Sequence, residues 1–254
     1  MAILKGLEDR YHQGKKSIAV LVDPDKVQDP SELDSLIRLA NENCVDFFFV
    51  GGSLVTTTNM GDVIRHIKEN VSIPVVIFPG STLQIDPAAD AILFLSLISG
   101  RNPDYLIGQH VVAAPILKNS RLEVMPTGYA LINSGKTTSA AYVSNTTPIP
   151  EDKYSLAACT ALAGEMLGLR LIYLDAGSGA ERAISAKMIS TVRKTISVPL
   201  IIGGGINTSE KAITALEAGA DMIVIGNALE KDPNLLTEIS DKVYDWNQSV
   251  KSER

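Results

Sequence analysis

Three glycine-containing turns in the last third of the chain are the residues best suited to chemistry. Each follows a short apolar run and precedes a segment with helical spacing of apolar residues. Glycine lets backbone N–H groups approach an anion closely, and a helix that starts just beyond the turn adds the positive end of its dipole, ~0.3–1 kcal/mol per favourable contact. Together the turns predict a site for one phosphate monoester, built from Tyr173, Leu174, Asp175, Ala176, Gly177, Ser178, Gly179, Gly204, Gly205, Gly226 and Asn227.

Polar side chains also follow two apolar runs near the N-terminus. Asp23 comes directly after the first run, and Ser53 closes the second run in Gly51-Gly52-Ser53. Two such oxygens are the sparse ligation that Mg²⁺ accepts when substrate phosphates and water complete its octahedron. Asp25 precedes a helix-like segment and is expected to cap it. The three histidines have no metal-ligand spacing, which argues against a zinc enzyme.

Two familiar phosphate-binding motifs are incomplete in this chain. Ser134–Thr137 reads Ser-Gly-Lys-Thr like the end of a P-loop, but Ala130 stands where the first glycine of that motif is required. Gly177-Ser178-Gly179 lacks the third glycine of the dinucleotide fingerprint, because Arg182 occupies its place. The sequence therefore predicts no nucleotide cofactor.

The elements that must position these residues alternate between apolar strand-like runs and helical segments. Short buried strands separated by helices are typical of parallel βαβ units, and eight of them in about 250 residues suit a (β/α)8 TIM barrel. With no linker dividing the chain, we expect residues 1–254 to form one barrel domain, an open doubly wound sheet being the alternative. The expected strands are Ser17–Val22, Val45–Val50, Ile73–Phe78, Ala91–Leu97, Tyr129–Asn133, Leu171–Leu174, Leu200–Ile202 and Met222–Ile225; the expected helices include Pro30–Asn43, Gly61–Asn70, Tyr154–Leu167, Ala183–Thr195 and Ser209–Ala218.

Two stretches depart from this alternation. Pro79–Asp90 is too short for a crossover helix with its turns, so the third helical layer should be short, irregular or extended and leave a gap in the outer ring. Ser134–Pro150 is rich in Ser, Thr, Gly and Pro and is expected to be a long loop at the active face, where it could contact substrate.

Composition excludes several classes of function. The net charge is −6, and the basic residues are scattered, which argues against a nucleic-acid partner. We find no secretory signal and no run near the ~18–20 apolar residues of a membrane span, so we expect a cytoplasmic protein without an integral membrane segment. Cys44 and Cys159 lie in apolar segments and are expected to be buried free thiols.

Several of these motifs, in this order, resemble one family across nearly the whole chain. The chain is similar to the geranylgeranylglyceryl phosphate synthase family of prenyltransferases, in its subgroup with an Asp-Pro-Asp start. Members attach a long isoprenoid to the 3-hydroxyl of sn-glycerol 1-phosphate, the first ether bond of archaeal-type lipids. The matching segments are Leu21–Lys26, Val50–Ser53, Gly108–His110, Tyr173–Gly179, Gly203–Ile206 and Val224–Ala228.

The resemblance implies roles for the residues above. Asp23 and Ser53 would hold Mg²⁺, the cofactor that bridges the diphosphate of an isoprenyl donor such as geranylgeranyl diphosphate. The three glycine turns would bind sn-glycerol 1-phosphate. Asp175 stands where many relatives have glutamate, the proposed base, and its shorter side chain leaves open whether it removes the hydroxyl proton or only orients the glycerol. Some relatives have a lysine where this chain has Leu21.

The donor requires a long apolar groove, which we expect beside Pro79–Asp90 and Leu93–Leu95. Tyr105 could close that groove or simply pack on the fourth helix.

Such barrels tend to associate, so a homo-oligomer is expected. Because the donor is lipid-like, transient contact with a membrane is also possible. Three alternatives remain: another phosphate-binding barrel enzyme, such as a sugar-phosphate isomerase or lyase; a non-catalytic barrel that binds a phosphorylated metabolite; and a structural role in a homo-oligomer.

Overall fold

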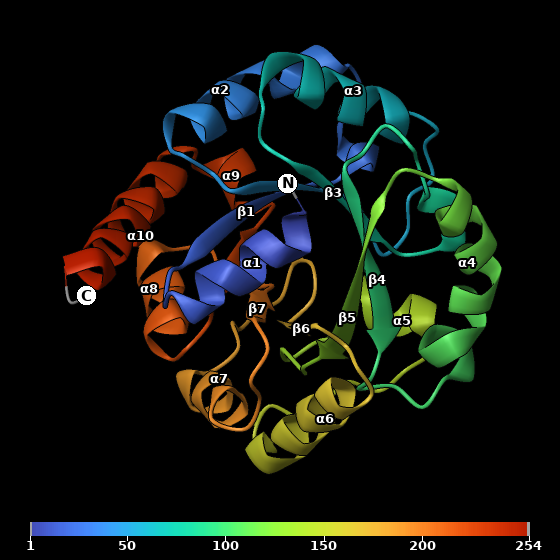
Figure 1. The fold of residues 1–254 in the computed structure, drawn as a ribbon, viewed down its shortest axis with the longest axis vertical. Coiled ribbons are helices and arrows are strands. Elements are labelled where there is room, and N and C mark those ends of the chain that lie inside the picture. The colour runs from blue at the N-terminus through green and yellow to red at the C-terminus, as the bar shows by residue number, and fades with distance from the viewer. Residues whose placement is uncertain (1, 253–254) are drawn as a thin grey trace.

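The computed structural model describes residues 2–252, without the side chains of residues 230, 231, 251 and 252. Eight parallel strands pair in chain order and close into a barrel, with β1 pairing both β2 and β8 (Figure 1). The predicted TIM barrel is thereby confirmed, and the open sheet is excluded. The strands are β1 (Ser17–Val22), β2 (Phe47–Gly52), β3 (Val75–Pro79), β4 (Ala91–Leu97), β5 (Glu123–Leu131), β6 (Leu171–Asp175), β7 (Leu200–Gly203) and β8 (Met222–Ile225).

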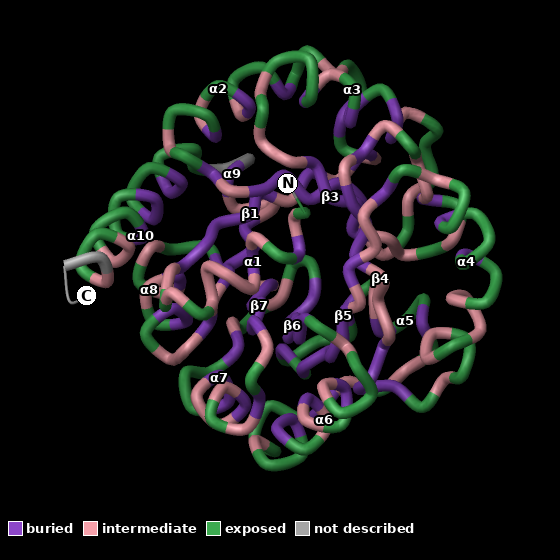
Figure 2. The backbone as a smooth tube through the Cα atoms, in the orientation of Figure 1, coloured by how far each residue is buried: buried purple, intermediate pink, exposed green. Residues whose placement is uncertain are grey.

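Helices surround the barrel and cover its outer face. Figure 2 shows buried strands at the centre and helices whose outer sides are exposed, as expected for amphipathic helices over a parallel sheet. All five helical segments named from the sequence form helices within a few residues of the expected bounds. The helices are α1 (Ile3–His12), α2 (Asp34–Glu42), α3 (Met60–Asn70), α4 (Gln109–Asn119), α5 (Ser139–Ser144), α6 (Tyr154–Met166), α7 (Ala186–Arg193), α8 (Ser209–Glu217), α9 (Ala228–Lys231) and α10 (Asn234–Ser252), with short turns η1 (Pro24–Lys26), η2 (Pro30–Leu33), η3 (Thr82–Gln84) and the π-helical η4 (Asp104–Gly108).

One end of the barrel is closed by α1, which the sequence analysis did not identify. Leu4 and Leu7 of this helix are buried against residues of the barrel interior. The Glu123 carboxylate, at the start of β5, accepts hydrogen bonds from the backbone N–H groups of Ile3 at 2.6 Å and Leu4 at 2.9 Å. Figure 1 shows α1 crossing the barrel. Because Glu123 begins its strand, this is the amino-terminal end, and the opposite end remains for chemistry.

The third helical layer is reduced to η3, as predicted. β3 and β4 pair over only two positions, Val76 with Ala91 and Ile77 with Ile92. Gln84 fixes the segment to the strand ends, because its amide oxygen accepts from the Gly80 N–H at 2.9 Å and its amide N–H donates to the Gly52 carbonyl at 3.3 Å. A short, pinned turn therefore stands where a helix would otherwise cover β3 and β4.

Two sequence-based expectations need correction. The stretch Ser134–Pro150 is not all loop: it contains α5, capped by the Thr138 hydroxyl, which accepts from the Ala141 N–H. Cys44, in the turn after α2, and Cys159, on α6, are exposed and not buried.

Of the part of the chain that the structure describes, no helix is both long and apolar enough to cross a membrane.

Candidate active site

The first two glycine turns lie in direct contact at the carboxyl ends of β6 and β7. Gly177, Gly179, Gly204 and Gly205 all have positive φ, between 69° and 87°. A Cβ atom on Gly204 would lie 2.6 Å from Asp175 Oδ1 and 2.7 Å from the Gly177 nitrogen. No other residue fits this approach. The two turns thereby bring backbone N–H groups to one place, which suits an anion, although the Gly177 N–H itself donates to Asp175.

The third turn joins the first through a side chain. Asn227 Nδ2 donates to the Ser178 hydroxyl at 3.3 Å, and Asn227 Oδ1 accepts from the Lys26 ammonium at 2.6 Å. Gly226 is less constrained than the other glycines, since a Cβ there would meet Leu21 at an ordinary 3.5 Å. The structure therefore brings together the three turns that the sequence singled out, which we call the phosphate cradle (Gly177–Gly179, Gly204-Gly205, Gly226-Asn227).

The remaining residues assigned to glycerol phosphate lie beneath the cradle. Leu174 and Ala176 pack in the layer between barrel and helices, so that only their backbone atoms can face a ligand. Tyr173 is 1% exposed and points into the barrel, where its ring stacks on Phe78 at 5.5 Å and its hydroxyl lies against Gly203. These residues shape the floor of the site.

Asp175 is 6% exposed, and both of its carboxylate oxygens have partners. Oδ1 accepts from the Gly177 N–H at 2.7 Å, and Oδ2 accepts from the Tyr129 hydroxyl at 2.5 Å. Burial raises the pKa of Asp175, and the two hydrogen bonds offset part of that rise. Tyr129 was not singled out from the sequence, although it begins the expected strand Tyr129–Asn133. The signal that could have found it is the strand register, which pairs Tyr129 with Tyr173.

Asp23 and Ser53 lie on the neighbouring ends of β1 and β2. The Asp23 carboxylate oxygen is 3.8 Å from the position of a Cβ on Gly52, the residue before Ser53. Among the described residues, no cluster of three or more His, Cys, Asp or Glu side chains could hold a metal. The two oxygens therefore do not make a complete protein site, but they fit Mg²⁺, which takes its other ligands from substrate phosphates and water.

The cap expected from Asp25 is supplied by Asp23 instead. Asp23 caps η1 by accepting from the Asp25 N–H at 3.1 Å. The Asp25 carboxylate instead accepts from the backbone N–H and hydroxyl groups of Thr56 and Thr57, at 2.8–3.0 Å. Burial raises the pKa of Asp25, but these hydrogen bonds outweigh it and lower the pKa to about 2. Asp25 thus ties the loop after Ser53 to the loop after Asp23.

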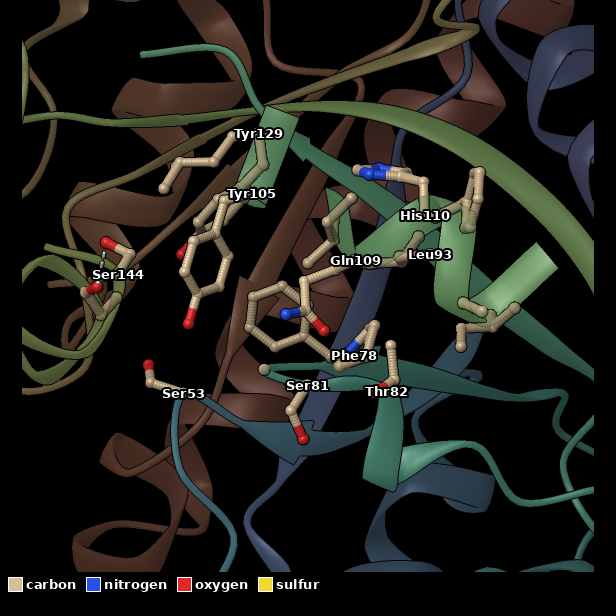
Figure 3. A pocket seen from close by; sticks show the side chains of 18 of the residues that line it. Ser53, Phe78, Ser81, Thr82, Leu93, Tyr105, Gln109, His110, Tyr129 and Ser144 are labelled. Carbon is tan, nitrogen blue, oxygen red and sulfur yellow. Dashed lines mark hydrogen bonds between the residues drawn. The ribbon is translucent and has the colours of Figure 1, made fainter. Parts of the chain in front are cut away.

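An apolar pocket of about 870 Å³, open mouth included, starts at Ser53 and runs between β4 and α4 (Figure 3). The pocket lies beside the short η3 layer, as expected from the sequence. His110 lies edge-on to Phe94 at 4.5 Å, and burial lowers the pKa of its imidazole. The apolar and aromatic lining comprises Phe78, Pro79, Ile85, Ile92, Leu93, Phe94, Leu95, Leu97, Tyr105, Ala113, Leu117, Tyr129, Leu131, Ala140 and Val143.

A closed barrel with glycine turns at the ends of β6, β7 and β8 is typical of the phosphate-binding class of TIM-barrel proteins. The model of the PcrB family matches residues 12–244. The chain is 57% identical to geranylgeranylglyceryl phosphate synthase of Spirosoma linguale, covering 96% of this chain and 98% of that protein, and 52% identical to that of Chitinophaga pinensis, covering 93% of each.

A solved structure of (S)-3-O-geranylgeranylglyceryl phosphate synthase from Thermoplasma acidophilum, in complex with its substrate sn-glycerol-1-phosphate, is also similar. It has a TM-score of 0.90 and 33% identity, and the match covers 96% of this chain and 99% of that chain. The chain belongs to the PcrB family of geranylgeranylglyceryl phosphate synthases, enzymes that transfer prenyl groups. The resemblance stated from its motifs is thereby confirmed.

Proposed function

We propose that this protein joins the isoprenyl chain of a long-chain isoprenyl diphosphate, geranylgeranyl diphosphate in the first instance, to the 3-hydroxyl of sn-glycerol 1-phosphate with Mg²⁺ as cofactor. The observation that carries the proposal is that one apolar pocket meets both polar sites. Ser53 and Tyr129 line the pocket, and Tyr129 donates to Asp175, which supports the cradle. The substrate named for the Thermoplasma acidophilum structure is a glycerol phosphate, in agreement.

The cradle orients the acceptor. Backbone N–H groups of the β6, β7 and β8 turns bind the phosphate, which leaves the glycerol hydroxyls to point toward Asp175. Each oxygen of the ionised Asp175 carboxylate has a lone pair beyond the one that its hydrogen bond uses, so the carboxylate can still accept the hydroxyl proton. The glycerol oxygen bonds to C1 of the isoprenyl chain as the bond from C1 to the diphosphate oxygen breaks. Asp175 takes the proton, and diphosphate leaves with the bonding electrons.

Asp23 and Ser53 would hold Mg²⁺, which neutralises charge on the diphosphate when bound. Their side of the site therefore receives the diphosphate, and Ser53 is one of the residues that line the pocket (Figure 3). The protein otherwise positions the two reactants and needs no covalent intermediate.

The isoprenyl chain occupies the pocket. β4 runs from Ala91 to Leu97 with its carboxyl end at the active face, so Ile92 and Leu117 mark the end of the pocket farthest from Ser53. At ~0.8 kcal/mol for each buried methylene, a chain that fills this length gains several kcal/mol. Tyr105 lines the pocket and so contacts the chain, and does not merely pack on α4.

The test measures transfer of the geranylgeranyl group by the purified protein from geranylgeranyl diphosphate to labelled sn-glycerol 1-phosphate, with and without Mg²⁺. The 3-phosphate enantiomer is assayed in parallel. We expect ether product from the 1-phosphate only, and none after chelation of Mg²⁺. A protein that binds glycerol phosphate tightly but transfers no donor would instead be a non-catalytic phosphate-binding barrel. Conversion of a sugar phosphate without Mg²⁺ would indicate an isomerase or lyase.

We also propose that the protein works as a homo-oligomer. α4 and the turn before it expose Ile107, Val111, Val112 and Ile116 on the side away from the pocket. A second copy over this face would remove apolar surface from water. Light scattering should give a multiple of the chain mass, and the mass of a single chain at assay concentration would contradict this.

A further inference from the structure

Lys26 links the loop after β1 to the phosphate cradle. It ends η1, three residues after Asp23, and its ammonium donates to Asn227 Oδ1 at 2.6 Å. The amide of Asn227 in turn donates to Ser178 at 3.3 Å. A row of hydrogen bonds therefore joins a lysine near the N-terminus to two turns of the cradle, across 201 positions of sequence.

The backbone N–H groups of the cradle balance only part of the negative charge of a bound phosphate. A phosphate monoester carries about −1.5 to −2 charges at neutral pH, whereas backbone N–H groups carry only partial charges. β1 itself places the apolar Leu21 against Gly226. A cation within side-chain reach of Asn227 would strengthen binding of a dianion much more than binding of a neutral polyol.

Two other cations near these turns are directed elsewhere. Arg182, beyond the β6 turn, makes two 2.9 Å hydrogen bonds to Glu151, and Lys211 donates to Asn207, four residues before it, at 2.8 Å. Lys26 alone among these three is bonded to a residue of the cradle as defined above.

We propose that Lys26 is a phosphate-binding residue of the glycerol phosphate site: its ammonium holds Asn227 and donates to a phosphate oxygen. This assignment rests on the proposed function of the cradle. An ammonium has three N–H donors on a flexible stem, so it can keep Asn227 as a partner while it reaches the anion. Lys26 thereby contributes a whole charge to the site, besides fixing the amide of Asn227 toward Ser178.

The test measures binding to the full-length protein by calorimetry, without donor, for sn-glycerol 1-phosphate and for inorganic phosphate. Replacing Lys26 by Met should weaken both about tenfold to a hundredfold, as expected for a charge-assisted hydrogen bond. In the wild type, affinity should rise between about pH 5 and pH 7 as the phosphate loses its second proton, whose pKa is about 6. Lys26→Met should flatten this rise, which loss of a structural contact alone would not do, and Lys26→Arg should restore most of it.

Lys187→Met is the matched control, because Lys187 is an exposed lysine whose ammonium lies 4.8 Å from the centre of the Tyr154 ring. It should change affinity less than twofold, a thermal melt confirming that each variant folds. If Lys26→Met binds both anions as the wild type does, the inference fails while the proposed function stands. If Lys26→Met weakens only the binding of Mg²⁺-pyrophosphate, measured in the same way as a stand-in for the diphosphate of the donor, then Lys26 serves the donor and the assignment is overturned. If the wild type binds neither anion, both the proposed function and the role of Lys26 are wrong.

Discussion

The Tyr129 hydroxyl donates a 2.5 Å hydrogen bond to Asp175 Oδ2 inside the barrel, where Tyr129 is 8% and Asp175 6% exposed. Tyr129 also lines the apolar pocket, while Asp175 binds the Gly177 N–H at the start of the cradle. One hydrogen bond thus connects the place proposed for the isoprenyl chain to the place proposed for glycerol phosphate. Burial raises the pKa of both groups, and their hydrogen bond gives each of them a polar partner inside the barrel.

Replacing Tyr129 by Phe should move the acid limb of the pH–rate profile to higher pH. The ionised Asp175 is the proposed base, so activity falls as pH drops through its raised pKa, and loss of a hydrogen bond that lowers that pKa moves the limb upward. The buried oxygen left without its partner should also cost about 1–3 kcal/mol of stability. Rates measured from acid to neutral pH, with a thermal melt, check both; an unmoved limb would contradict the proposed base.

Replacing Asp175 by Asn should abolish most transfer and leave the fold intact. Loss of a general base costs about 10²–10⁴-fold in kcat. Because the folded pKa of Asp175 is raised, ionisation of this carboxyl costs stability as pH rises through that pKa, so the melting temperature of the Asn variant should not fall at neutral pH. The KM for glycerol phosphate should change little, since the phosphate binds the turns. If kcat survives and only KM rises, Asp175 orients the glycerol and is not the base.

The barrel was predictable because it follows from local periodicity. Short apolar runs and helical segments alternate along the chain, and three strands fall at the bounds read from the sequence, among them β1 and β4. β5 was placed six residues too late, because Glu123 and Pro126 interrupt its apolar pattern even though it pairs β4 over seven positions. α1 was missed although Leu4 and Leu7 have helical spacing, and its place at the end of the barrel is a tertiary relation that no local pattern indicates.

The parts of the site that depend on glycine conformation were predictable from the sequence. The parts that depend on which strand residues lie opposite each other were not. Positive φ and close approach at Gly204 leave a mark on the sequence, since only glycine fits. The bond between Tyr129 and Asp175 joins residues 46 positions apart and depends on the register of β5 and β6. The capping partner of Asp25 was assigned wrongly for the same reason: a local cap and a distant loop are equally compatible with an aspartate at that position.

Replacing Asp25 by Ala should raise the Mg²⁺ concentration needed for half-maximal transfer. Thr56 and Thr57, which Asp25 binds, follow Ser53 by three and four residues, so their release would free the loop that carries one proposed ligand. Loss of a group that orients ligands typically costs about 10–100-fold in metal affinity. The binding constant of glycerol phosphate, measured without metal, should not change.

Asp29→Ala is the matched control for this variant. Asp29 lies in the same loop and accepts from the Ser31 N–H and hydroxyl at the start of η2, which lowers its pKa in a similar way. Its loss removes a cap but no contact to the loop after Ser53. Equal Mg²⁺ titrations for the Asp25 and Asp29 variants would show that Asp25 has no special relation to the metal site.

Replacing Ala113 by Phe should shift donor preference toward shorter isoprenyl chains. Ala113 is 6% exposed and lies on the pocket side of α4, one turn before Leu117, so a larger side chain there occupies the deeper part of the pocket. A long donor then loses burial at ~0.8 kcal/mol for each excluded methylene, while a short donor loses none. The comparison is kcat/KM over a series of donor lengths. Ala114→Phe, the same change at an exposed position of the same helix, should leave the series unchanged. If both variants or neither alter the series, the chain does not occupy this pocket.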